Sequence, residues 1–300
     1  MGDFAFWMSK LPHLRVDRAH GGPAPHKPLL LLVILDLAEQ DELPTEVLPL
    51  SPELAFRFYT YWSIVAARRS HRPDIRLPFH YLQSDGFWSA VDEMGNPSPG
   101  RKLTRFAGLP SDFYQFAKDP ASRDKARRVL IATYFTKSEQ IALSEAVGLP
   151  VPSGTDLEHE AAYRSPRDAA RAGRDARFRL NVVAAYNYAC ALTGYSLTTI
   201  TAGSVVDAAH IHEFADSRND DLKNGLALCK NVHWSFDLGL WTIANDYHVI
   251  VAVGRFKEES PNGRSLAEYH GERLRLPADS NLWPSPIHLA WHRKNRFVGF

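Results

Sequence analysis

The chain has 300 residues, of which 45% are hydrophobic, and its 35 basic and 34 acidic residues leave a formal net charge of +1. This length and apolar content allow one large core or, as we expect, two domains. Apolar runs such as Leu29 to Leu35 are far too short to cross a membrane, which excludes a membrane-spanning class. The start, MGDFAFWMSK, lacks the basic and apolar stretches of a secretion signal. We therefore expect a cytoplasmic protein with reduced cysteines and no membrane partner.

The first 150 residues predict a mostly helical domain with a small β element. Pro28 is predicted at the first position of a helix that continues through LLLLVILDLAEQ. Ser51, followed by Pro52 and Glu53, is typical of a helix N-terminus, and Ser122 is predicted to cap a further helix in the same way. Between these helices, the segments RLPFHYLQSDGFWSAV and MGNPSPG favour a small hairpin.

A domain boundary is predicted where Pro, Gly, Ser and charge replace the apolar periodicity. Residues 151–165 are the expected linker between a domain at 1–150 and a second domain at 166–300. A helix from about Arg167 to Asn187 is expected to open the second domain. The predicted fold class is α+β.

The second domain contains a segment with a clear local order. Gly203 to Ile211 is rich in β-branched residues and predicts a strand with His210 near its end. The polar run from Asp216 to Asn224 predicts a loop that the turn dipeptide Asn224-Gly225 closes. Leu226 to Leu228 predicts a second strand.

A helix is predicted to follow that second strand. Asn231 is the expected N-cap of a helix across Val232 to Leu240. His233 and Asp237 stand four residues apart and therefore share one face of it. The segment thus predicts a strand, a loop, a strand and a helix, with one His at a strand end and another on the helix.

Residue types and order in this segment fit the hydrolysis of a phosphodiester. That reaction needs an attacking water, a base for its proton, and positive charge near the phosphate, which a His and one divalent cation supply. Three short motifs resemble those of the HNH endonucleases, which have a ββα-metal fold. They are AAHI, NGLALC and HWSFD, and the resemblance extends over about Arg177 to Val253. The resemblance implies that His210 is the general base, that Asn224 orients the loop and the base, and that His233 binds the metal.

The metal shell has one departure from that family. Many HNH relatives carry a metal ligand directly before the base, where this chain has Ala209. Asp237 or Asp207 is expected to complete the ligand set, and Mg²⁺ or Mn²⁺ is the expected ion. A zinc site that uses Cys190 and Cys229 is the rival interpretation, although the chain has no CxxC pair.

Two segments of the first domain, PHKPLLLL and RRSHRPDIRLPFHYL, add a second resemblance. Together they resemble the sulfur-binding domain of type IV, McrA-like restriction endonucleases that recognise phosphorothioate-modified DNA. That family joins such a domain to a C-terminal HNH domain, and this chain has the same order. The resemblance implies a modification-dependent endonuclease whose partner is double-stranded DNA with a phosphorothioate linkage. Relatives often show Arg where this chain has Lys27 and Tyr where it has Leu77.

Sulfur in place of a phosphate oxygen is larger and less strongly hydrated, so an apolar cup favours it over oxygen. We expect that cup around Pro78, which has no backbone N–H. The other candidate residues contribute apolar surface, cationic charge or base contacts. The apolar candidates are Leu77, Phe79 and Tyr81, the cations at the mark are His26, Lys27 and His80, the cations for the flanking backbone are Arg68, Arg69 and Arg72, and the candidate base readers are Arg101 and Arg105.

Other interpretations remain open at this stage. Leu77, Phe79 and Tyr81 alternate as the core-facing residues of a strand do. Two alternatives to an endonuclease that recognises phosphorothioate are an HNH restriction enzyme that reads another mark such as methylcytosine, and a DNA-binding protein with an inactive HNH domain. A double-strand cut by single-metal sites requires two of them, so we also expect a homodimer on DNA.

Overall fold

A computed structural model describes residues 2–18, 22–66, 73–151 and 166–299, so Arg68, Arg69 and Arg72 lie outside the described residues. The chain divides into two compact units. Unit 1 comprises Met1–Arg177 with Thr199–Gly203, and unit 2 comprises Phe178–Thr198 with Ser204–Phe300. The domain limits at 150 and 166 stay a prediction. No helix in the described ranges is long and apolar enough to span a membrane.

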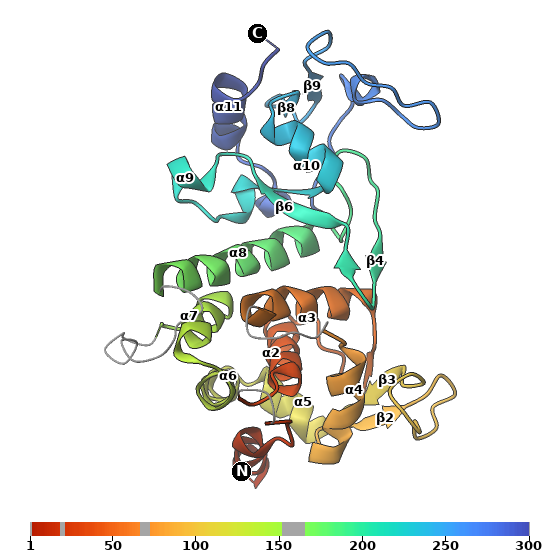
Figure 1. Ribbon diagram of the computed structural model, residues 1–300, viewed down its shortest axis with the longest axis vertical. Helices are drawn as coiled ribbons and strands as arrows, with labels where there is room; N and C mark the ends of the chain where they lie inside the picture. The colour runs from red at the N-terminus through yellow and green to blue at the C-terminus, as the bar shows by residue number, and fades with distance from the viewer. Residues whose placement is uncertain (1, 19–21, 67–72, 152–165, 300) are drawn as a thin grey trace. The chain divides into compact units, whose positions relative to one another are not determined.

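Unit 1 is mostly helical and contains one small antiparallel sheet, of order β1-β3-β2. The predicted α+β class is therefore confirmed. The elements of unit 1 (Figure 1) are α1 (Gly2–Lys10), α2 (His26–Glu39), β1 (Val47–Pro49), α3 (Pro52–Val65), α4 (Arg76–Tyr81), β2 (Ser89–Val91), β3 (Phe106–Gly108), α5 (Ser111–Lys118), α6 (Pro120–Tyr134) and α7 (Lys137–Ala146).

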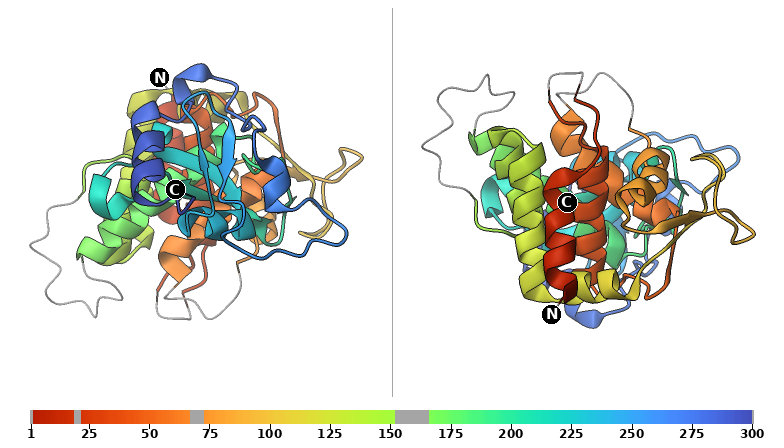
Figure 2. Two further views of the ribbon diagram at one scale, coloured as in Figure 1. Left: turned by 90° about the horizontal axis from the view of Figure 1, so that it is seen from above. Right: turned by 90° about the horizontal axis from the view of Figure 1, so that it is seen from below.

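Helix α2 forms the centre of unit 1. Every residue from Lys27 to Ala38 is buried, and the helix packs against α3, α4, α5 and α6 (Figure 1, Figure 2). A helix that is apolar on all sides is stable only when other elements surround it, as they do here. The long apolar run of the sequence is thus the core of this unit.

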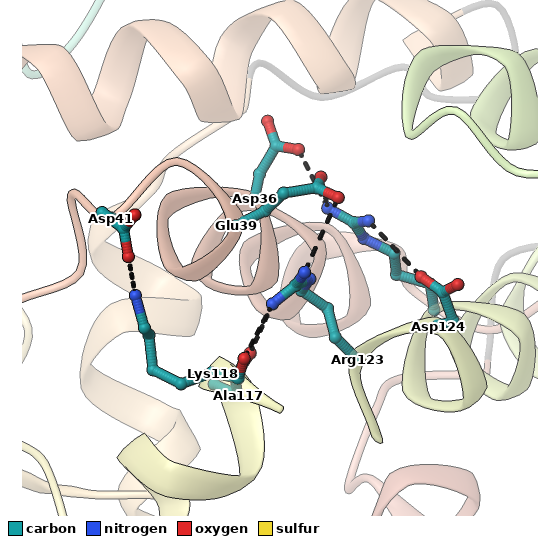
Figure 3. Close-up of polar contacts among 8 residues, drawn as sticks. Asp36, Glu39, Asp41, Ala117, Lys118, Arg123 and Asp124 are labelled. Atoms are coloured by element: carbon teal, nitrogen blue, oxygen red, sulfur yellow. Dashed lines mark hydrogen bonds and ion pairs between the residues drawn. The ribbon is translucent and has the colours of Figure 1, made fainter. Parts of the chain in front are cut away.

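The last turns of α2 carry charge into that core. The Asp36 carboxylate lies 3.1 Å from Nη2 of Arg127, and Glu39 lies 2.7 Å from the same nitrogen. Arg123 approaches Glu39 from the same helix α6 (Figure 3). Burial raises the pKa of Asp36, while Arg127 and then Arg57 oppose that rise. The arginines therefore offset the cost of burying the carboxylate.

The predicted helix starts have mixed outcomes. The Ser51 cap is confirmed, because its hydroxyl accepts a hydrogen bond from the Leu54 N–H at 3.1 Å. The Ser122 cap is wrong: Asp119 caps α6, and Ser122 donates to it from inside the first turn. Helix α2 begins at His26, so Pro28 is not its first residue, although Pro28 still lies in the first turn, where a missing N–H costs nothing.

The predicted hairpin over residues 76–91 is wrong in its first half. Arg76–Tyr81 is α4, and a 3₁₀ helix at Leu82–Asp85 follows. Ile75, Phe79 and Leu82 are all fully buried and lie about one helical turn apart, which is the helical period that the alternation of Leu77, Phe79 and Tyr81 concealed. Only Ser89–Val91 forms a strand, paired with β3.

Helix α8 (Pro166–Ala185) contributes residues to both units, and from Phe178 onward it belongs to unit 2. Unit 2 consists of short hairpins and helices. Its other elements are β4 (Thr198–Thr199), β5 (Gly203–Ser204, of which Gly203 belongs to unit 1), β6 (Val206–His210), α9 (Phe214–Ser217), β7 (Gly225–Cys229), α10 (Lys230–Asp237), β8 (Trp241–Ile243), β9 (Val249–Val251) and α11 (Pro286–Asn295).

The β6–β7–α10 order is the strand, loop, strand and helix that the sequence predicts. Strands β6 and β7 are antiparallel, with Val206 opposite Cys229 and His210 opposite Gly225. A Cβ at Gly225 would lie 2.5 Å from Val182 of α8, so this close packing requires glycine. Helix α10 starts at Lys230 after Cys229, so Asn231 is not its N-cap. It ends at Asp237, before Gly239 with φ +69°, rather than at Leu240.

Replacing Arg127 should destabilise unit 1. We expect Arg127→Met to lower its free energy of unfolding by about 3 kcal/mol, because the buried Asp36 carboxylate loses its nearest cation. Hydrogen exchange of the α2 amides across a urea series measures this change. Arg128→Met is the matched control, since Arg128 lies on the same helix and is exposed. Equal losses for both variants would contradict the role of the buried ion pair.

Candidate functional site

His210 is the last residue of β6, and the sequence predicts it near the end of a strand. Its Nε2 lies 2.9 Å from Oδ1 of Asp220. Its ring stacks on Phe178 of α8, with centroids 3.9 Å apart and planes 3° from parallel. The imidazole is thus held on one edge and on one face, and about a fifth of the side chain remains exposed (20%).

Asn224 is fully buried at the end of the loop between β6 and β7. Its amide oxygen accepts from the His212 N–H at 2.8 Å, and its amide nitrogen donates to the carbonyls of His212 at 2.8 Å and Asn219 at 2.9 Å. Its own carbonyl accepts from the Ile211 N–H. The side chain therefore ties the segment that follows His210 to the loop that bears Asp220.

His233 and Asp237 lie one turn apart on α10, which packs against both β6 and β7. His233 Nε2 is 3.6 Å from Asp237 Oδ2. Burial raises the pKa of Asp237; His233 opposes that rise, Glu213 adds to it, and Arg296 opposes it. A cation beside this pair would favour the charged carboxylate, so the two side chains suit a divalent ion.

Asp207 is placed less favourably for a metal. Its Oδ1 forms an ion pair with Nε of Arg179 at 2.8 Å, and this pair must open before Asp207 can bind an ion. Ala209, at the position where many HNH relatives have a ligand, is buried. Within the described residues, no group of three or more His, Cys, Asp or Glu side chains converges on one point. The ligand set of His233, Asp237 and Asp207 therefore stays a prediction.

The two cysteines lie next to each other. Cys229 Sγ lies 3.7 Å from Cys190 Sγ, and both residues are buried. The hydrogen bond from Cys229 lowers the pKa of Cys190 to about 5, and the same contact raises the pKa of Cys229. With no converging third ligand among the described residues, the rival zinc interpretation has no support.

A cavity of about 490 Å³ lies in unit 1 at the start of α2 and beside α4. Its lining brings together His26 and Lys27 with Leu77, Pro78 and Tyr81, which the sequence predicts as one binding site from two distant segments. The remaining lining residues are Arg15, Val16, Asp17, Ala24 and Ser84. Most of the lining that α4 contributes is apolar.

The charges at this cavity differ from the predicted arrangement. Lys27 is buried and forms an ion pair with Asp85, at 2.6 Å between Nζ and Oδ2. The same carboxylate accepts the Arg15 N–H at 2.8 Å. Lys27 is therefore largely neutralised within unit 1. Arg15 is exposed and is one of the lining residues, so it is a candidate cation for the cavity.

Several predicted reader residues do not line the cavity. Phe79 is fully buried in the core, and its ring lies 5.9 Å from that of Trp88 with the planes tilted by 46°. His80 is also buried, with Nδ1 2.8 Å from the Thr104 hydroxyl, and burial lowers its pKa, so it is a poor cation for a phosphate. Arg105 donates to the Lys102 and Thr104 carbonyls. The base-reading roles of Arg101 and Arg105 stay predictions.

Three parts of the candidate sites were missed in the sequence. Asp220 lies in the polar run that the sequence predicts only as a loop. The signal for it is a carboxylate between the strand-end His210 and the loop-closing Asn224, where it can reach the histidine. Phe178 lies on α8 and precedes its partner His210 by 32 residues, so no spacing rule connects the two. Arg15 to Asp17 lie in a segment without regular structure, which left no periodicity to interpret.

Two family models match the chain. Residues 66–151 match the ScoMcrA-like DNA sulfur-binding domain, a region that contains Leu77, Pro78 and Tyr81. Residues 190–244 match the HNH endonuclease model, a region that contains His210, Asn224 and His233. The two matches occur in the order that the sequence resemblance implies.

Two solved structures are similar to parts of the chain, and no curated protein matches it. The "Sulfur binding domain of SprMcrA complexed with phosphorothioated DNA" is 21% identical and has a TM-score of 0.41, covering 49% of this chain and 94% of that one. The "Modification dependent TagI restriction endonuclease" is 17% identical and has a TM-score of 0.30, covering 69% of this chain and 50% of that one. From the two family models, the chain joins a ScoMcrA-like DNA sulfur-binding domain to an HNH endonuclease domain.

Proposed function

We propose that the chain is a modification-dependent DNA endonuclease that binds phosphorothioate-modified duplex DNA and hydrolyses phosphodiester bonds near the mark. The observation that carries this proposal is the presence, in one chain, of a sulfur-binding domain match and an HNH match. Two further observations support the proposal: five of the predicted reader residues line one cavity of unit 1, and His210 and His233 lie on β6 and α10 of unit 2.

The cavity accounts for a preference for sulfur over oxygen. A phosphate oxygen placed against Pro78 and Leu77 loses hydrogen bonds to water and gains none, whereas sulfur has little hydration to lose. The remaining charge of the linkage needs a cation, and Arg15 is the exposed one at the lining. Because Lys27 is paired with Asp85, Lys27 contributes to the shape of the cavity lining more than to its net charge.

At the nuclease site, His210 is the proposed general base, which takes a proton from the attacking water. Asn224 holds the loop next to it. His233 and Asp237 would hold a divalent ion, with Asp207 as a further candidate once its pair with Arg179 opens. Such an ion, Mg²⁺ or Mn²⁺, supplies positive charge at the scissile phosphate and the leaving oxygen.

A homodimer on DNA belongs to the same proposal. One such site cuts one strand, so a double-strand cut requires two sites. Two chains on one duplex meet that requirement.

The cleavage specificity tests the function as a whole. Wild-type protein with Mg²⁺ or Mn²⁺ should cut a duplex that carries one phosphorothioate linkage and leave the plain duplex intact, while His210→Ala should abolish cutting and keep binding. Gel analysis of end-labelled duplexes, prepared with each separated phosphorus diastereomer, measures this. Equal cutting of plain DNA, or cutting of a methylcytosine duplex instead, would contradict the proposal.

Pro78 should matter for the mark and not for DNA in general. We expect Pro78→Ala to weaken binding of modified duplex about tenfold, because the ring surface is lost and a backbone N–H appears at the cavity. Binding of plain duplex should stay within about twofold. Fluorescence anisotropy at one salt concentration measures both affinities.

Pro120→Ala is the matched control for this variant, because Pro120 is also in the first turn of a helix and lies far along the chain from the cavity lining. Equal losses on modified and plain duplex for Pro78→Ala would mean that Pro78 only supports the fold.

His233 should contribute to metal binding. We expect His233→Ala to weaken the binding of Mn²⁺ at least tenfold, or about 1.4 kcal/mol, because one of two neighbouring ligands is removed. Isothermal titration of the full chain with Mn²⁺ measures this without DNA. His248→Ala is the control, because His248 forms a similar pair with Asp246 at 3.1 Å outside the site. Unchanged Mn²⁺ affinity in His233→Ala would remove this residue from the ligand set.

A further inference from the structure

We propose that Asp220 is a positioning residue for His210, which selects the imidazole tautomer that can act as a base. This inference rests on the proposed function, since it assigns Asp220 a role in the same reaction.

The contact itself fixes the direction of the hydrogen bond. Oδ1 of Asp220 lies 2.9 Å from Nε2 of His210, and both side chains are mostly shielded, at 26% and 20% exposure. A carboxylate can only accept, so Nε2 must donate. In a neutral imidazole this leaves the lone pair on Nδ1, which makes Nδ1 the atom that accepts the proton of water.

The ring also has a fixed orientation. Phe178 stacks against it with planes 3° from parallel, so the ring cannot tilt while it keeps this contact. Rotation within the plane is then controlled by the bond from Nε2 to Asp220. The two contacts together leave one direction for Nδ1.

The backbone around Asp220 is held from both sides. The Asn219 carbonyl accepts from the buried Asn224 amide at 2.9 Å, and Asn219 Oδ1 accepts from the Asp221 N–H at 2.8 Å. The Asn219 amide nitrogen also lies 3.3 Å from Nε2 of His288 on α11. Asn224 therefore acts on the His210 ring indirectly, by setting the place of Asp220.

Asp220 is not a capping residue. Among the described residues, the bond to His210 is the one hydrogen bond that its carboxylate makes, whereas the neighbouring Asp221 caps a turn by accepting the Lys223 N–H. The loop thus carries two adjacent carboxylates with different tasks, one structural and one directed at the base.

In the proposed step, His210 takes the proton that the attacking water loses. The attacking water gives its proton to Nδ1, its oxygen forms the new bond to phosphorus, and the bond to the leaving oxygen breaks with its electron pair on that oxygen. The ring becomes an imidazolium, and the Asp220 carboxylate stabilises that charge without taking the Nε2 proton. Solvent protonates the leaving oxygen.

The kinetic test uses the full chain and a duplex with one phosphorothioate linkage. Asp220→Asn should lower the single-turnover cleavage rate about 10- to 100-fold, the usual cost of losing a carboxylate that orients a histidine. The affinity for the duplex should stay within about twofold, because Asp220 is not at the cavity. Asp221→Asn is the matched control, and an Asn there keeps the cap, so its rate should stay at the wild-type level.

A second readout reports on the ring directly. In ¹⁵N-histidine spectra of the DNA-free protein, with His210 assigned by its loss in His210→Ala, wild type should show the Nε2–H tautomer. Asp220→Ala should show a mixture, and Asp221→Asn should match wild type. A purely structural role for Asp220 would not move this signal in a folded variant.

The outcomes separate the two proposals. An unchanged tautomer in Asp220→Ala, or equal rate losses in Asp220→Asn and Asp221→Asn, would overturn the role of Asp220 while wild-type cleavage of modified DNA leaves the proposed function intact. If wild type cuts no modified duplex, the proposed function fails, and the tautomer spectra still decide whether Asp220 controls His210.

Discussion

The nuclease half of the chain depends on the side-chain amide of Asn224. This group is fully buried and makes three hydrogen bonds, two to the backbone of His212 and one to the carbonyl of Asn219. If this amide is lost, its three part-buried backbone partners lose their hydrogen bonds, at a cost of up to about 1–3 kcal/mol for each group. The end of β6 and the loop after it are therefore held together, and this loop carries Asp220 next to His210.

Unit 1 depends instead on one buried helix, α2, which is apolar in its middle and carries polar residues at both of its ends. Helix α2 begins with His26 and Lys27 at the cavity and ends with the buried Asp36 and the exposed Glu39, which both pair with Arg127. Because the residues between them are buried on all sides, the start of the helix cannot shift without disturbing that packing. The packing of α2 therefore fixes the position of the two lining residues that this helix contributes, His26 and Lys27.

Sequence reasoning reached the parts of the site that local rules determine. His210 stands at a strand end and His233 pairs with Asp237 because β-propensity, a turn dipeptide and helical spacing act within a few residues. It placed α4 wrongly because Leu77, Phe79 and Tyr81 alternate, and only tertiary packing reveals that Phe79 is in the core. The hydrogen bond that His210 donates to Asp220 depends on how the loop between β6 and β7 folds. The ion pair of Lys27 with Asp85 depends on the packing of two segments that are distant in the sequence. No local periodicity predicts either contact.

The central claim is that the sulfur of a modified linkage enters the cavity beside Pro78. The ³¹P resonance of a single phosphorothioate is well separated from those of the ordinary phosphates, so it reports on that linkage alone. Titrating the full chain into such a duplex should shift or broaden this resonance before the others, and Pro78→Ala should need about tenfold more protein for the same effect. A phosphorothioate resonance that stays in place while the ordinary phosphates respond would contradict the account.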